Sequence, residues 1–195
     1  MKHDPLPHLE PHHRRLQYLS SRYERTGNLQ DLETAINRSV VASEATPEDH
    51  PERPKVLNNL GFHFSRRYGR TGNLQDLEAA IAYSEEAVRT ILISVDHPDR
   101  AVCLNNLGMH LNSRYKHTGN MQDLEAAIHR TEAALDATPT GHPGHSTRWN
   151  NLGLFFFIKS LLVFILRYMT RVCIPEWLLG KIIQPLGHTS PAQFI

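Results

Sequence analysis

The sequence predicts an all-α protein, a solenoid of about three stacked helix pairs followed by the first helix of a fourth pair. Two short markers repeat in step along the chain. The triplet Thr-Gly-Asn begins at positions 26, 71 and 118, and the tetrapeptide Asn-Asn-Leu-Gly begins at positions 58, 105 and 150. The spacings are 45 and 47 residues for the first marker and 47 and 45 for the second. Such a period is typical of stacked helical repeats.

Each unit contains two stretches with the apolar spacing of an amphipathic helix. In the second unit, the first stretch has apolar positions at i, i+3, i+4, i+7 and i+11, occupied by Leu57, Leu60, Gly61, Phe64 and Tyr68. The second stretch follows the Thr-Gly-Asn triplet and contains Leu74, Leu77, Ala80, Ile81, Ala87 and Val88. The third unit repeats both stripes. This periodicity predicts a helix pair in each unit.

The residues of the Thr-Gly-Asn turn predict how the two helices are joined. Glycine adopts the left-handed conformation that ends a helix, and the asparagine side chain can cap the next helix. An aspartate three residues after the asparagine lies near the positive end of that second helix. Prolines then mark the boundary to the next pair, at Pro47, Pro51, Pro54, Pro98, Pro139 and Pro143.

These motifs resemble the tetratricopeptide repeat. The resemblance rests on Leu-x-x-Leu-Gly in the first helix, Ala-Ile with an alanine seven residues further on in the second, and a closing proline. The consensus repeat has about 34 residues. An excess of seven residues in the turn and of four or six between units accounts for the longer period. The resemblance implies a right-handed solenoid over residues 12–153.

The longer unit, with its Leu-Asn-Asn-Leu-Gly motif, most resembles kinesin-light-chain-like repeats, in particular the arrays found in fungal NACHT, NB-ARC or CHAT-domain proteins. The first unit has His-His-Arg-Arg in place of this motif and is expected to act as a polar cap. The predicted organisation is an N-terminal tail, the repeat array, a hydrophobic helix and an irregular tail. Their ranges are 1–11, 12–153 (units at about 12–53, 54–100 and 101–145 and a partial unit at 146–153), 154–168 and 169–195.

The repeat pattern is lost after Gly153, where an apolar run with a single lysine begins. Three interpretations remain open. Residues 152–168 could form a membrane-associated helix, although the apolar stretch of 15 residues is shorter than the about 20 that span a bilayer. They could instead form a capping helix, for which an apolar surface all round is unusual. In the third interpretation, the sequence after Gly153 is a truncated or misread continuation of the repeat.

Composition and charge exclude several classes of function. Lysine and arginine number 21 against 20 aspartates and glutamates, and a net charge of +1 lacks the basic excess of nucleic-acid-binding proteins. The charge is unevenly distributed, because residues 149–195 contain four basic residues and one acidic residue. The two cysteines, Cys103 and Cys173, make no disulfide framework and suggest a reducing compartment, so we expect a cytoplasmic protein unless the C-terminal segment places it at a membrane.

Residue types that often form catalytic or metal sites have structural interpretations in this chain. His50, His97 and His142 each precede a proline at a unit boundary, and a whole helix pair separates successive copies, which argues against one shared metal ion. The repeated Asp-Leu-Glu triads suit helix N-termini better than acid-base catalysis. Cys103 has no base nearby in sequence, and no phosphate-binding glycine loop occurs. We therefore predict no enzymatic activity, no metal and no cofactor.

The asparagine pairs on the predicted first helices are the candidate functional residues. They could hydrogen-bond between neighbouring repeats and set the stacking angle. The resemblance implies another role, since first helices line the concave face and the asparagine before Leu-Gly binds the backbone of an extended peptide in kinesin-light-chain-like repeats. An amide suits this role because it offers both a donor and an acceptor. The predicted site comprises the matching Asn59, Asn106 and Asn151, then Asn58 and Asn105, with Phe62, Met109, Asn112 and Lys55 as side-chain contacts.

The sequence thus predicts a non-catalytic scaffold that binds a protein or an extended peptide on the concave face of a solenoid. Two alternatives follow from the C-terminal segment. One is a tail-anchored adaptor that presents the repeats at a membrane through residues 152–168. The other is a truncated gene-model fragment of a larger repeat protein.

Overall fold

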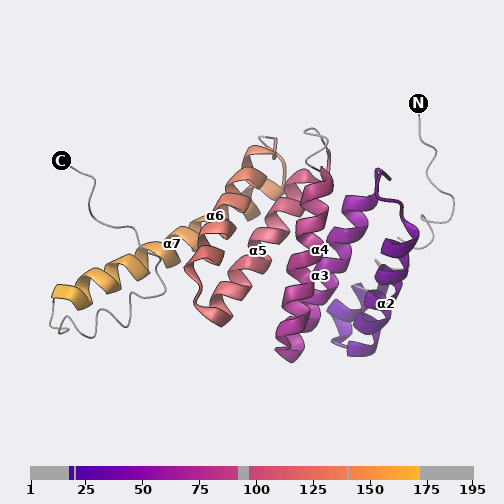
Figure 1. The fold of residues 1–195 in the computed structure, drawn as a ribbon, viewed down its shortest axis with the longest axis horizontal. Helices are drawn as coiled ribbons and strands as arrows, with labels where there is room; N and C mark the ends of the chain where they lie inside the picture. The colour runs from indigo at the N-terminus through magenta and orange to yellow at the C-terminus, as the bar shows by residue number, and fades with distance from the viewer. Residues whose placement is uncertain (1–17, 20, 92–96, 140, 172–195) are drawn as a thin grey trace.

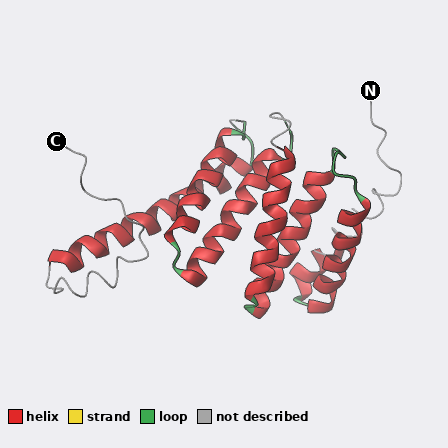
Figure 2. Ribbon diagram, viewed as in Figure 1, coloured by secondary structure: helices red, strands yellow, loops and turns green. Residues whose placement is uncertain are grey.

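The computed structural model describes residues 18–19, 21–91, 97–139 and 141–171, with side chains described as far as Ile165. All secondary structure in these ranges is helical, as Figure 2 shows, which confirms the predicted all-α class. A helical stretch at residues 21–26 precedes the labelled helices. These are α2 (Leu29–Ala45), α3 (Arg53–Thr71), α4 (Leu74–Ile91), α5 (Arg100–Thr118), α6 (Met121–Asp136) and α7 (Gly144–Arg171).

The helices stack as consecutive pairs (Figure 1). The most extensive packing joins the two helices of a unit, α3 with α4 and α5 with α6. Each pair then packs on its neighbour in the chain, through α2 with α3, α4 with α5 and α6 with α7. This arrangement confirms a solenoid of the tetratricopeptide type. The predicted N-terminal tail at residues 1–11 and most of the predicted C-terminal tail lie outside the described residues, and the unit boundaries stay predictions.

The turn within each unit has the predicted chemistry. Gly27, Gly72 and Gly119 have φ angles of 67°, 69° and 74°, and each donates its N–H to the carbonyl of a tyrosine four residues earlier. The Oδ1 atom of the following asparagine accepts a hydrogen bond of 3.0 Å from the backbone N–H two residues on, in all three copies. The glycine therefore ends one helix and the asparagine begins the next.

An ion pair across this turn was not predicted. The Arg67 guanidinium donates two hydrogen bonds to the Asp76 carboxylate, of 3.0 Å from Nε and 2.7 Å from Nη2. Arg114 and Asp123 form the same pair at 2.9 Å and 2.7 Å, and a third copy joins Arg22 to Asp31. Each aspartate is buried at the start of a second helix. A fork of two parallel hydrogen bonds fixes the angle at which the chain reverses.

Small residues let the two helices of a unit approach closely. A Cβ atom on Gly108 of α5 would lie 2.5 Å from Thr131 Oγ1 and 3.1 Å from the Ala127 carbonyl oxygen on α6. Gly61 on α3 meets α4 in the same way, with a Cβ position 2.8 Å from Ser84 Oγ. The Leu-Gly glycines of the second and third units are therefore points of helix contact where no larger residue fits.

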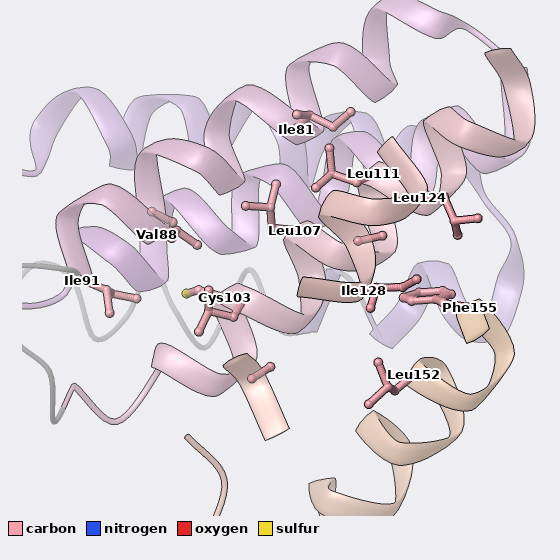
Figure 3. Close-up of a cluster of buried hydrophobic side chains, with 14 of the residues drawn as sticks. Ile81, Val88, Ile91, Cys103, Leu107, Leu111, Leu124, Ile128, Leu152 and Phe155 are labelled. Carbon is pink, nitrogen blue, oxygen red and sulfur yellow. The ribbon is translucent and has the colours of Figure 1, made fainter. Parts of the chain in front are cut away.

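The main hydrophobic core runs through the second and third units and into α7. Figure 3 shows side chains from α4, α5 and α6 converging, with Leu152 and Phe155 of α7 completing the cluster. Phe155 is fully buried. The predicted first helix of a fourth unit is therefore packed against the array as earlier first helices are.

Buried polar pairs connect α2 to α3 and α4 to α5, which are contacts between a second helix and the first helix of the next unit. Ser39 Oγ lies 3.0 Å from His63 Nδ1, and Ser84 Oγ lies 3.0 Å from His110 Nδ1. At the next interface Thr131 occupies the serine position and Phe155 the histidine position. Thr131 Oγ1 is buried and has no hydrogen-bond partner among the described residues. The third unit and α7 are thus joined at these positions by apolar packing, whereas the earlier units are joined by a hydrogen bond.

The helix α7 joins two segments that the sequence analysis treated as separate, the partial unit at 146–153 and the hydrophobic helix at 154–168. It continues without a break past Gly153 and includes residues 169–171, which the sequence analysis assigned to the irregular tail. No proline occurs after Pro143 until Pro175, and the intervening residues sustain a helix. A Cβ atom on Gly153 would meet nothing within 4 Å. Among the described residues, nothing therefore packs against the side of α7 that corresponds to the Gly108 contact on α5.

Gly108→Ala and Gly153→Ala form a matched pair that tests the close approach. The added methyl at position 108 must displace Thr131 and the α6 backbone, so we expect a loss of about 1–3 kcal/mol in the free energy of unfolding. At position 153 the methyl meets open space, and we expect a gain of about 0.5–1 kcal/mol from helix propensity. Urea unfolding measures both values. Equal effects of the two changes would contradict this account of helix packing.

The buried histidines make the stability depend on pH. Burial lowers the pKa of His63 and of His110 to about 4, from an ordinary value of 6.5. As the pH falls, the unfolded chain takes up these protons first, so their contribution is complete above pH 6.5 and is lost between 6.5 and 4. We expect each histidine to cost about 2 kcal/mol of stability at pH 5 relative to pH 7.

His110→Phe, which copies the residue found at position 155, is the control variant. It should be less stable at neutral pH because Ser84 loses its partner, yet it should lose about half of the pH dependence. Urea unfolding at pH 7 and pH 5 gives both quantities. An unchanged pH dependence in the variant would show that His110 is not the titrating group.

Candidate functional site

The first helices of successive units lie on the inner side of the stack. α3 contacts α5, and α5 contacts α7, and both contacts are more extensive than any between α2 and α4 or between α4 and α6. Elements that are more closely spaced line the concave side of a curved stack. The asparagine pairs belong to α3, α5 and α7 and therefore lie on helices of the inner layer.

The asparagine pairs form hydrogen bonds from unit to unit. Asn106 Nδ2 on α5 donates to Asn58 Oδ1 on α3 at 3.0 Å, and Asn151 Nδ2 on α7 donates to Asn105 Oδ1 on α5 at 3.1 Å. In the third and fourth units, the second asparagine thus bonds to the first asparagine of the preceding unit. We call this pattern the asparagine ladder. It agrees with the interpretation in which the asparagines hydrogen-bond between neighbouring repeats. It also spaces amide groups regularly along the inner layer.

The ladder leaves part of each amide's hydrogen-bonding capacity unused. A primary amide has two N–H donors and an oxygen that can accept two bonds. Asn106 uses one N–H in the ladder and keeps its oxygen and its second N–H. Asn58 is buried, while Asn59, Asn105, Asn106 and Asn151 are half-buried. The half-buried amides can therefore contact a ligand without leaving the ladder.

The predicted side-chain contacts differ in their exposure. Phe62 is half-buried, with the Arg66 guanidinium 5.0 Å from its ring centroid, and Met109 is half-buried at the edge of the core. Lys55 pairs with Glu52 at 3.1 Å. Asn112 is buried, and its Oδ1 atom has no partner among the described residues. Phe62 and Met109 are thus available beside the ladder, whereas Asn112 belongs to the interior.

The repeated histidines have the structural role predicted for them. His50, His97 and His142 each accept a hydrogen bond through Nδ1 from the backbone N–H two residues further on, at 3.1, 3.2 and 3.0 Å. These bonds shape the approach to the next first helix. In the described part of the chain, no group of three or more histidines, cysteines or carboxylates is placed to hold a metal ion.

Cys103 lies on α5 and is buried in the main hydrophobic core. Burial, with a smaller contribution from Asp99, raises the pKa of its thiol to about 12. The side chain therefore remains a neutral thiol near pH 7. A thiolate nucleophile would require a lowered pKa, so Cys103 functions as a core residue.

A cleft of about 700 Å³ lies between the start of α5, the end of α6 and the start of α7. Its lining includes His97, Arg100, Asp136 and Arg148, and none of the predicted peptide-binding residues. Arg148 is buried there, with Nε donating to the Ala101 carbonyl at 3.4 Å and Nη1 without a partner among the described residues. Burial lowers the pKa of Arg148. The cleft is thus separate from the candidate site.

The helix α7 is long and apolar enough, over Gly144–Ile165, to cross a membrane by length and composition alone. Only 17% of its most apolar window is buried by the rest of the protein.

Comparison with known families supports the type of repeat. Residues 100–144 match the sequence model of the family described as "Tetratricopeptide repeat". This segment contains α5, the turn at Gly119 and α6, which together make one complete helix pair. No curated protein shows significant sequence similarity to the chain. The match and the stacked helix pairs together support a tetratricopeptide-repeat protein, a class that generally mediates interactions between proteins.

Comparing Asn106→Ala with Asn59→Ala measures how much a ladder hydrogen bond contributes to stability. Both changes bring the same small gain in helix propensity, but only the first removes a ladder hydrogen bond. We therefore expect Asn106→Ala to be less stable than Asn59→Ala by about 1 kcal/mol in urea unfolding. Identical stabilities would show that the Asn58–Asn106 bond contributes nothing to the stack.

Proposed function

We propose that this protein is a non-catalytic scaffold that binds an extended peptide segment of a partner protein along the inner layer of first helices. The asparagine ladder is the observation that carries the proposal. Its half-buried amides recur at the repeat spacing on helices that contact one another. The proposed mode resembles that of kinesin-light-chain-like repeats.

Extended peptides are the ligand class that suits this chemistry. Each peptide group offers one N–H and one carbonyl, and the unused donor and acceptor of an asparagine can bond to both. Helical peptides are less suitable because their backbone groups are already bonded to one another. Recognition through the backbone would tolerate different side chains, so specificity must come from flanking residues.

Phe62 and Arg66 of α3 are the flanking residues best placed to add specificity. The guanidinium lies over the aromatic ring and also pairs with Glu24. An aromatic ring next to a cation accommodates an apolar or acidic side chain of the ligand. We infer that a preferred ligand carries such a residue near the end of the segment that contacts α3.

The test uses peptides selected by the full chain from a random library displayed on phage. We expect Asn59→Ala combined with Asn106→Ala to weaken the selected peptides at least tenfold, measured by calorimetry. Gln122→Ala, which removes an exposed amide from the outer helix α6, should leave affinity unchanged. N-methylation of alternate peptide groups should abolish binding, because it removes the backbone donors.

Equal affinity of the wild type and the double asparagine variant would overturn the proposed site. Circular dichroism and urea unfolding of the same variant detect any loss of fold. A peptide that binds as tightly after N-methylation would show that side chains, and not the backbone, are recognised.

A further inference from the structure

The outward side of α7 has the features of a self-association surface. Leu154, Phe157, Leu161 and Phe164 are 45%, 64%, 45% and 65% exposed. They follow one another at intervals of three, four and three residues, which is the spacing of the apolar seam of a coiled coil. At 100° per residue, this seam lies opposite the side that carries the buried Leu152 and Phe155. One side of α7 therefore packs on the array, and the other presents an apolar seam.

The seam corresponds to the side of a first helix that normally receives the next unit. On α5, Asn105 bonds to Asn151 of α7, so this side of α5 meets the following first helix. The positions on α7 that correspond to Asn105, Met109 and Asn112 of α5 are Asn150, Leu154 and Phe157. All three of these α7 residues are exposed. The seam is thus a stacking surface on which Phe157 replaces a polar asparagine and Leu154 replaces an apolar methionine.

The geometry points to a second copy of this chain as the occupant, and we propose that two α7 helices pair antiparallel to form a dimer. The 3-4-3 spacing is symmetric about position 159. Antiparallel pairing therefore places Leu154 against Phe164 of the other copy and Phe157 against its Leu161. Each pair of facing side chains then consists of one leucine and one phenylalanine. A two-fold symmetric interface requires this kind of self-complementarity.

The charge and area of the surface agree with a protein partner of this kind. The seam contains no ionisable residue, so two copies meet without like-charge repulsion. The two phenylalanines of the seam, Phe157 and Phe164, leave roughly 260 Å² uncovered at about 200 Å² for each side chain, and Trp149 and Phe156 on the adjoining side of α7 leave roughly 200 Å² more. The exposed leucines, valine and isoleucine add to this. A monomer rarely exposes more than about 600 Å² of contiguous apolar surface, and a standard interface covers about 800 Å² per partner.

The packing of α7 disfavours a bilayer as the occupant. The half of the candidate span before residue 160 is held against the array by Leu152 and Phe155 and by the Lys159–Glu125 ion pair at 3.2 Å. Lipid can surround only the remainder, residues 160–171, which is about 18 Å long at 1.5 Å per residue. The hydrocarbon core is about 30 Å thick. A partner that covers one side of α7 fits the exposed surface better.

The oligomeric state of the full chain tests the proposal. We expect light scattering at micromolar concentration to give twice the 22.3 kDa monomer mass. Phe157→Glu with Leu161→Glu should give a monomer of unchanged helicity, because both positions are exposed. Val41→Glu is the matched control, since Val41 is 62% exposed on α2 and lies far from α7 in sequence and in the stack. This control should remain dimeric.

Disulfide cross-linking tests the orientation, in a Cys173→Ser background. A mixture of Leu154→Cys and Phe164→Cys chains should form heterodimeric disulfides, while either variant alone should not. Efficient cross-linking of Leu154→Cys with itself would indicate parallel helices and would overturn the antiparallel arrangement.

Two further outcomes would overturn the dimer. One is a wild-type chain that stays monomeric throughout the micromolar range. The other is a monomer that floats with phosphatidylcholine vesicles and loses flotation in the Phe157→Glu, Leu161→Glu variant, because that result assigns the seam to a bilayer. None of these measurements depends on peptide binding, so the dimer and the proposed scaffold function can fail separately.

Discussion

The close approach of two helices within each unit is the constraint on which the rest of the structure depends. At Gly108 the α5 backbone lies against Ala127 and Thr131 of α6, with no room for a side chain between them. This contact sets the distance between the helices, and the ion pair between Arg114 and Asp123 sets the angle at the turn. With both fixed, each unit is a rigid block whose two faces can stack on the next.

The contacts between blocks are of two kinds, and they change along the chain. At the earlier interfaces, directional bonds such as the one between Ser84 and His110 align one unit with the next. At the last interface Phe155 replaces the histidine, and the Thr131 hydroxyl loses its partner. Apolar packing is less directional than a hydrogen bond. The inner layer nevertheless remains in register there, because Asn151 still bonds to Asn105.

The sequence predicted most of the local structure because the signals for it are local. Gly72 and Asn73 are adjacent and act on their own backbone, so the turn could be recognised without knowledge of the fold. The pair between Arg67 and Asp76 was missed, although its nine-residue spacing recurs in all three units. That spacing has no meaning on a single helix and becomes a contact only when the chain reverses at the turn. The buried role of His110 was missed for a similar reason, since its serine partner lies 26 residues away.

The sequence alone determined the repeat, the helix pairs and the turn chemistry, because these follow from periodicity and from residues that act on their neighbours. Only the tertiary structure decided which amides bond between units and which side of α7 is buried. The sequence shows α7 as apolar nearly all round, without indicating which residues meet the array. Packing against α6 selected Leu152 and Phe155 for the interior and left Leu154 and Phe157 exposed, because a helix can pack one side on a neighbour and must present the other.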